Sequence, residues 1–365
     1  MKFSLDSTLL SEKLGHVQGI SERRSTMPIL SHTLIEAGTE GLRITATDLD
    51  TIIIIAFGAD VQDPGSIALP SKKLYEIVRE LPQGKVEFEE MNNHWVGIRS
   101  LNSSFKIAGL PGDDFPEVKA RDSVDMFPIN SEVMEDMISK TIFAVTPDEL
   151  RRNLSGIYFE QDGSTLRLIA TDGHRLSLAQ RSDVGELSLA GNFLVPKKGV
   201  GELSKILRSY ESVKMGCSGT DFFTESDGVL LIVRLIEAEF PDYKQVIPET
   251  TKSSLSIVRV ELLSAIRRVS LLSSEKTRSV KFSIEPGKLV LSSVSPEVGE
   301  AREEISITYD GDPIEIGFNS KYVIEAIEQT DTDTLTIALT DELSPVVIKP
   351  EGDDSYLAVI MPMRV

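Results

Sequence analysis

Asp172 and His174 come nearest, in type and spacing, to a catalytic group in this chain. A carboxylate and an imidazole can activate a serine hydroxyl, which would predict an acyl-transfer enzyme. The strings that usually carry enzyme chemistry are missing: the chain has no Gly-x-Ser-x-Gly, no Gly-x-x-x-x-Gly-Lys-Ser/Thr and no His-Glu-x-x-His. The alternative is that Asp172-Gly173-His174 is a structural turn. We therefore expect a protein that is not an enzyme.

The composition gives no sign of a metal or a cofactor, and we expect neither. Cys217 is the only cysteine, so it can form no internal disulfide and no cysteine-rich zinc site. A single cysteine suits a reducing cytoplasm. No apolar run approaches ~18 residues, which predicts no membrane span. The histidines are scattered without the spacing of metal ligands: His16, His32, His94 and His174.

The elements that would position these residues come from a threefold internal repeat. The string from Leu42 to Asp48 returns as Leu166 to Asp172, and Phe115-Pro116 returns as Phe240-Pro241, with Met361-Pro362 closing a third cycle. Repetition of this kind decides the architecture. It predicts three similar tandem domains, at residues 1–122, 123–250 and 251–365.

Each repeat opens with a short alternating segment and an amphipathic helix, and a second helix lies near its middle. Leu10, Leu14 and Val17 show the helical spacing of the first, for which Ser7 is the candidate N-cap, as Ser131 is in the second repeat. Short strands separated by turns fill the rest and favour antiparallel sheets. The fold class is therefore α+β, with two helices packed on antiparallel sheet in each domain. We expect strands to pair across the joints between domains.

The net charge is −19, which argues against simple electrostatic binding of nucleic acid. Basic residues nevertheless recur on or beside all six expected helices, including Lys72, Lys197 and Lys198. They could be ordinary solvated helix faces. If the helices line one surface, they would instead form a positive track that contacts phosphates without reading sequence.

The whole chain resembles the bacterial DNA sliding clamp family, the β subunit of DNA polymerase III. The strings that carry the resemblance are Thr171 to Leu176, Phe240 to Tyr243 and the terminal Met361 to Arg364. The resemblance implies a non-catalytic processivity factor. Two chains would form a head-to-tail homodimer, a ring of similar domains around duplex DNA.

The resemblance also implies a peptide pocket for the replicative polymerase, the clamp loader and repair proteins. Leucine, valine, methionine and proline would form an apolar slot, and methionine adapts to varied side chains. His174 and Arg175 would border the slot and orient the peptide. The matching positions are Leu154, Thr171, Gly173, His174, Arg175, Leu176, Pro241, Val246, Val359, Met361, Pro362, Met363 and Arg364.

Two further sets of residues follow from the resemblance. Those expected to contact DNA are Arg24, Lys72, Arg151, Arg152, Asn153, Lys197 and Lys198. Arg152-Asn153 replaces a tyrosine pair of known members, so phosphate contact is expected there rather than base stacking. Asp148 replaces an amide and would repel phosphate. Those expected at the ring joint are Lys73, Phe105, Leu271, Leu272, Glu297, Glu300, Glu303 and Glu304. The alternative function is a peptide-binding hub that acts without DNA.

Overall fold

The computed structural model describes the chain except for residues 22–26, 119–123, 149, 183, 185–188, 190 and 365. It contains six α-helices in the described part, as expected: α1 (Ser7–Val17), α2 (Ser71–Glu80), α3 (Ser131–Ile142), α4 (Lys197–Leu207), α5 (Arg259–Ser270) and α6 (Ser320–Glu328). None of these helices is long and apolar enough to cross a membrane. The described residues contain no group of three or more His, Cys, Asp or Glu that could hold a metal ion.

The order of elements confirms the repeat. The second and third repeats each run as one strand, a helix, four strands, a helix and three strands, from β11 to β18 and from β19 to β26. The first repeat follows the same order with an added strand, β5, before α2 and the short β10 at its end. Contacts divide the chain differently, into two compact units. The first consists mainly of Met1–Glu132 and Lys198–Leu235, and the second of most of the rest.

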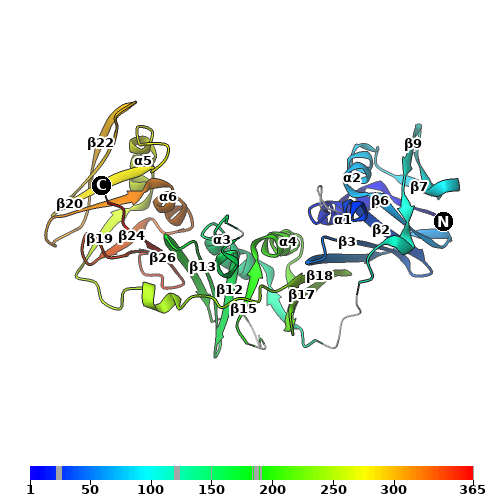
Figure 1. Cartoon of the computed structure of the whole chain (residues 1–365), viewed down its shortest axis with the longest axis horizontal. Coiled ribbons are helices and arrows are strands. Elements are labelled where there is room, and N and C mark those ends of the chain that lie inside the picture. Colours follow the sequence, from blue (N-terminus) through cyan, green and yellow to red (C-terminus); the bar gives the residue numbers. More distant parts are fainter. Residues whose placement is uncertain are drawn as a thin grey trace. The chain divides into compact units, whose positions relative to one another are not determined.

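The first unit contains two antiparallel sheets (Figure 1). Sheet A has the order β5-β1-β7-β8-β9, and sheet B the order β10-β6-β2-β3-β4-β18-β17-β16-β11. The strands of sheet A are β1 (Lys2–Asp6), β5 (Asp60–Asp63), β7 (Lys85–Glu90), β8 (Trp95–Ser100) and β9 (Ser103–Ala108). Those of sheet B are β10 (Leu110–Pro111), β6 (Gly65–Pro70), β2 (His32–Gly38), β3 (Gly41–Thr47), β4 (Thr51–Phe57), β18 (Val229–Arg234), β17 (Asp221–Ser226), β16 (Ser212–Ser218) and β11 (Phe127–Asn130).

The second unit contains sheet C, with the order β15-β12-β13-β14-β26-β25-β24-β19, and sheet D, with the order β22-β21-β20-β23. The strands of sheet C are β15 (Phe193–Pro196), β12 (Gly156–Asp162), β13 (Thr165–Thr171), β14 (Arg175–Arg181), β26 (Tyr356–Ile360), β25 (Val346–Pro350), β24 (Thr334–Leu339) and β19 (Ser253–Val258). Those of sheet D are β22 (Gly299–Ser306), β21 (Lys288–Ser295), β20 (Ser279–Glu285) and β23 (Ile314–Asn319).

Strands from neighbouring repeats pair with each other, as expected. β4 pairs antiparallel with β18, for example through Ile53 and Leu231. β14 pairs in the same way with β26, for example through Leu176 and Val359. Each pairing makes one continuous sheet out of two repeats, so backbone hydrogen bonds, and not only side chains, hold consecutive repeats together.

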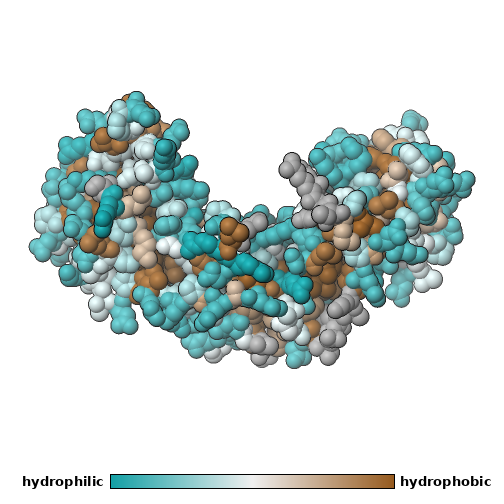
Figure 2. Space-filling view, viewed as in Figure 1, coloured by the Kyte–Doolittle hydropathy of each residue, from teal (hydrophilic) through white to brown (hydrophobic). Residues whose placement is uncertain are grey.

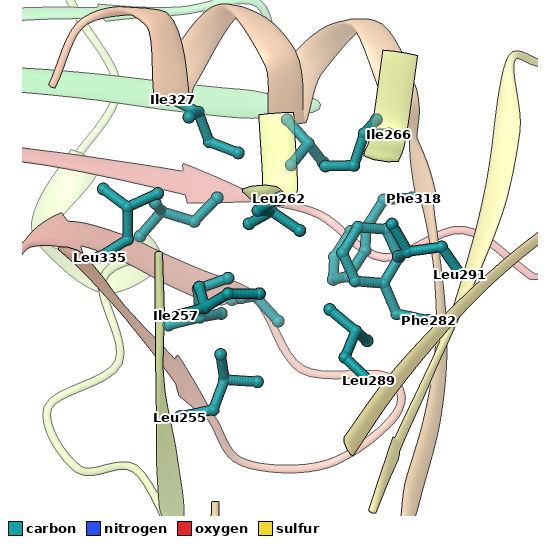
Figure 3. Packing of buried hydrophobic residues seen from close by; sticks show 14 of the residues in the cluster. Leu255, Ile257, Leu262, Ile266, Phe282, Leu289, Leu291, Phe318, Ile327 and Leu335 are labelled. Atoms are coloured by element: carbon teal, nitrogen blue, oxygen red, sulfur yellow. The ribbon is translucent and has the colours of Figure 1, made fainter. Parts of the chain in front are cut away.

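The apolar stripe of each helix faces sheet, as its spacing requires. In the third repeat, Leu262 and Ile266 of α5 and Ile327 of α6 lie over Phe282, which packs edge-on against Phe318 at 5.0 Å between ring centroids (Figure 3). These side chains are buried. Polar and charged residues predominate on the face shown in Figure 2. Burying apolar area in this way is the main stabilising contribution to each repeat.

The expected helix caps were one residue off. Ser7 is the first residue of α1, and the cap is Asp6, whose carboxylate accepts from the N–H groups of Thr8 and Leu9 at 2.8 and 3.2 Å. The Ser7 hydroxyl donates instead to the carbonyl of Pro82. Ser131 likewise lies inside α3. A strand runs directly into each helix, and its last residue is the N-cap of α1, α2, α5 and α6.

Candidate functional site

The turn between β13 and β14 is built by its own side chains. One oxygen of the Asp172 carboxylate accepts from the N–H groups of His174 and Arg175, at 2.9 and 3.0 Å, and the Thr171 hydroxyl accepts from the N–H of Gly173. The His174 ring stacks near Tyr322 instead of bonding to Asp172. A catalytic Asp–His pair is therefore not formed, and the structural-turn interpretation holds.

The first repeat contains the same turn. The N–H groups of Asp50 and Thr51 donate to the Asp48 carboxylate, and that of Leu49 donates to the Thr47 hydroxyl. Leu49 has a φ of 82°, close to the 87° of Gly173. The repeated Thr-Asp string thus encodes a specific turn, because a short acidic side chain satisfies the N–H groups that a tight turn leaves open.

Arg175 connects this turn to the third repeat. Its guanidinium donates to the Asp172 carboxylate, to the carbonyl of Phe143 at 2.7 Å and to the Glu325 carboxylate on α6. It also lies over the Tyr322 ring, 4.5 Å from the centroid. The side chain is only 7% exposed. Because its nitrogens are engaged inside the protein, Arg175 positions the site and does not offer a free charge to a ligand.

Arg151 lies against the same turn. Its guanidinium donates to the carbonyl of Asp172 at 2.7 Å. Its other terminal nitrogen lies 2.8 Å from where a Cβ of Gly173 would be. Glycine at position 173 suits the left-handed backbone, and a Cβ there would have to displace the end of the Arg151 side chain.

A cavity of about 240 Å³ opens beside this turn. Its walls come from the 3₁₀ segment Arg152–Leu154, the start of β14, the linker around Pro241 and the end of β26. The volume is below the roughly 300–1,000 Å³ of typical small-molecule sites. The lining residues are Arg151, Asn153, Leu154, Thr171, Gly173, Arg175, Leu176, Pro241, Tyr243, Val246, Val359 and Met361.

Most residues of the expected peptide pocket therefore surround one cavity. Those that do not line it are His174, Pro362, Met363 and Arg364. Backbone hydrogen bonds place the terminal segment nearby: the N–H of Met361 donates to the carbonyl of His174, and that of Met363 to the carbonyl of Gly317. Tyr243 lines the cavity and was missed, although it closes the Phe-Pro-Asp-Tyr string that the sequence singled out.

The residues expected to contact DNA lie in several environments. Arg151 and Asn153 line the cavity, and the side chain of Arg152 is exposed. Lys198 is paired with the Asp48 carboxylate, and Lys72 lies 3.7 Å from that of Glu76. Lys197 is exposed, but partial burial of its ammonium and the nearby Arg175 and Lys321 charges lower its pKa. Arg24 lies outside the described residues.

Acidic partners offset many helix cations in the described chain. Lys13 and Lys140 are buried and contact Glu12 and Asp136, and Arg268 pairs with Glu303. Acidic side chains therefore pair with several of the cations that the expected positive track would use.

The residues expected at the ring joint lie on or beside two sheet edges, just after α5 and on α2. Phe105 on β9 is 38% exposed, and Leu271, just after α5, is 77% exposed. Leu272 is partly exposed. Lys73 bonds to Glu76 of its own helix at 2.7 Å. The acidic residues lie on or beside β22: Glu297, Glu300, Glu303 and Glu304.

The chain is similar to known proteins along its full length. Models of the DNA polymerase III beta subunit match in order: the N-terminal domain over residues 1–119, the central domain over 128–242 and the C-terminal domain over 244–364. The beta sliding clamp of Caulobacter vibrioides is 36% identical over 100% of both chains. Solved structures agree. The C. crescentus beta sliding clamp with PEG bound to a putative beta-motif tethering region has a TM-score of 0.94 at 35% identity, covering 100% of this chain and 99% of its own. The Pseudomonas aeruginosa clamp bound to griselimycin has a TM-score of 0.92 at 29% identity, covering 100% of both chains.

Proposed function

Because the chain belongs to the bacterial DNA sliding clamp family, the DNA polymerase III β subunits, we propose that two copies close head to tail around duplex DNA and hold partner proteins by short peptides. The chain is a processivity factor, an accessory subunit without catalytic activity of its own. We place it in the cytoplasm with the replication machinery. The expected partners are the replicative polymerase, the clamp loader and repair proteins.

The observation that carries the proposal is the cavity beside the Thr171–Arg175 turn. Leu154, Leu176, Val359 and Met361 give it apolar walls, and Pro241 brings in the linker before the third repeat. Each wall comes from a different part of the chain, and the Asp172–Arg175–Glu325 bonds fix the turn beside it. A preformed apolar slot can bind a peptide with little ordering cost.

Two open sheet edges support ring closure. β9 ends sheet A and β22 ends sheet D, so among the described residues each has one side without a strand partner. Unpaired strand edges readily join another chain. Phe105 projects from the first edge, and Leu271 and Leu272 follow the helix that packs on β22. A partner subunit that joined one edge to the other would cover these apolar side chains.

The distribution of charge supports weak, movable contact with DNA. Arg152 is exposed, whereas Lys72, Lys198 and Arg268 have acidic partners. With a net charge of −19, the protein has little to bind DNA tightly by counterion release. A ring does not need tight binding, because it is retained by encircling the duplex.

The decisive experiment loads the protein with a clamp loader onto nicked circular DNA and then cuts the circle. A ring remains on the circle and leaves when ends appear. A peptide-binding hub would be monomeric and would not remain on the circle. In parallel, a chain lacking residues 361–365 should lose partner peptide and still dimerise, because it loses Met361 from the cavity wall but neither sheet edge. Normal peptide binding by the truncated chain would refute the pocket assignment.

A further inference from the structure

Sheet C has apolar clusters on both of its faces. Val346, Ile348 and Ile360 point into the core beneath α5 and α6, whereas Val347 and Val359 belong to a second cluster. Successive residues of a strand point to opposite faces, so the second cluster lies on the side away from those helices. The linker from Phe240 to Ile247 covers this cluster.

One buried hydrogen bond joins that linker to the sheet. The Tyr243 hydroxyl donates to the Glu160 carboxylate on β12 at 2.7 Å. Tyr243 and Glu160 are 5% and 7% exposed. Arg167 and Lys244 approach the other carboxylate oxygen at 3.1 and 3.2 Å. A carboxylate with this set of partners is a strong acceptor, because hydrogen bonds to an ionised group are stronger than neutral ones.

The ionisation of both groups favours this bond at neutral pH. Burial pushes the pKa of Glu160 up, but the hydrogen bonds from Tyr243 and Lys244 and the charges of Lys244 and Arg167 outweigh it, so the pKa lies below its usual value. Burial and the hydrogen bond to Glu160 raise the pKa of Tyr243. Glu160 is therefore ionised and Tyr243 carries its proton.

Tyr243 also forms part of the cavity. It lines the cavity together with Pro241 and Val246 of the same linker, opposite residues supplied by the strands. The Glu160 hydrogen bond fixes the hydroxyl end of the ring and so restricts the ring to one orientation. Displacement of this ring would move the linker wall relative to Leu176 and Val359.

We propose that Tyr243 is a positioning residue for partner binding, and that its hydrogen bond to Glu160 sets the linker wall of the cavity for an apolar peptide. The inference rests on the proposed function and deepens it. It assigns the shape of the pocket to a pair of residues, one of which, Glu160, does not line the cavity. Loss of the bond leaves the apolar lining intact and loosens one wall.

The test measures binding of a fluorescently labelled short peptide with leucine and phenylalanine at its centre to the full chain and to three variants. Tyr243→Phe removes the donor and should weaken binding roughly tenfold, mainly through faster dissociation. Glu160→Gln keeps an acceptor oxygen and should stay within about threefold of the unchanged chain. Tyr158→Phe is the matched control. It removes a hydroxyl from a ring that stacks on Phe240 at 4.7 Å and that makes no hydrogen bond among the described residues.

A pH profile separates positioning from general loss of stability. Peptide affinity of the unchanged chain should fall at acidic pH, below the usual pKa of a glutamate, as Glu160 takes up a proton, and the profile of Glu160→Gln should be flatter. Wild-type affinity for Tyr243→Phe, equal losses in Tyr243→Phe and Tyr158→Phe, or identical pH profiles would each overturn the inference. Failure of the unchanged chain to bind the peptide would instead overturn the proposed pocket. If Tyr243→Phe does not fold, the pH profiles of the unchanged chain and of Glu160→Gln still test the inference.

Discussion

The guanidinium of Arg151 occupies the space that a side chain on Gly173 would need. One of its nitrogens lies 2.8 Å from the Cβ position of residue 173, and the other donates to the carbonyl of Asp172. The edge of the cavity is thus formed by a close fit between a long cationic side chain and a glycine. A methyl group added at residue 173 would therefore have to shift the end of the Arg151 side chain.

Gly173→Ala should destabilise the chain and weaken peptide binding. The left-handed backbone at 87° costs an alanine about 1–2 kcal/mol, and the methyl group must also displace Arg151. Gly163→Ala is the control, since its φ of 59° is also left-handed but nothing lies within 4 Å of the added Cβ. The test compares the thermal midpoints and the peptide affinities of the two variants. Equal effects on peptide binding would show that the contact with Arg151 is unimportant.

Arg175→Lys should lower the thermal midpoint of the second unit. A lysine cannot donate at once to the Asp172 and Glu325 carboxylates and to the carbonyl of Phe143. It would therefore leave buried acceptors without donors. The expected loss is about 2 kcal/mol or more. Calorimetry measures it, with Arg267→Lys as a control at an exposed ion pair. A midpoint as high as that of the control would mean that Arg175 does not hold the turn to α6.

Leu271→Ala combined with Leu272→Ala should loosen the homodimer. Leu271 is largely exposed in the single chain, so its burial in a ring would stabilise the joint by the hydrophobic effect. The dissociation constant should rise at least tenfold, which corresponds to about 1.4 kcal/mol. Analytical ultracentrifugation tests this against Leu343→Ala, an exposed leucine away from both sheet edges. Unchanged self-association of the double variant would place the joint elsewhere.

Stability should fall as the pH drops below about 6.5, the usual pKa of histidine. Burial and the charge of Lys13 lower the pKa of His16, against the opposing charge of Glu12. The unfolded chain therefore takes up a proton at a higher pH than the folded one, and this histidine destabilises the fold as it charges. In His16→Gln the thermal midpoint should change less between pH 8 and pH 5 than in the unchanged chain. Some dependence on pH should remain, because burial also lowers the pKa of His32. The same pH dependence in both proteins would show that His16 does not cause it.

The repeat made the helices and the cross-repeat strand pairs predictable. Leu154, Leu176 and Met361 were assigned to one pocket through the family resemblance, and they line one cavity. The charge pattern was less informative, because sequence spacing does not reveal a partner such as Asp48, which lies 150 positions from Lys198. Tyr243 was missed for a related reason. Its bond to Glu160 exists only because the linker folds back over a sheet face.

The middle repeat shares both of its sheets with its neighbours. Its strands β11, β16, β17 and β18 belong to a sheet with the first repeat, and β12 to β15 to a sheet with the third. A fragment cut out at the repeat boundaries would leave β14 without β26 and β18 without β4. Because unpaired strand edges readily join other chains, we expect the fragment to aggregate. Repeats that share sheets in this way cannot be exchanged one at a time.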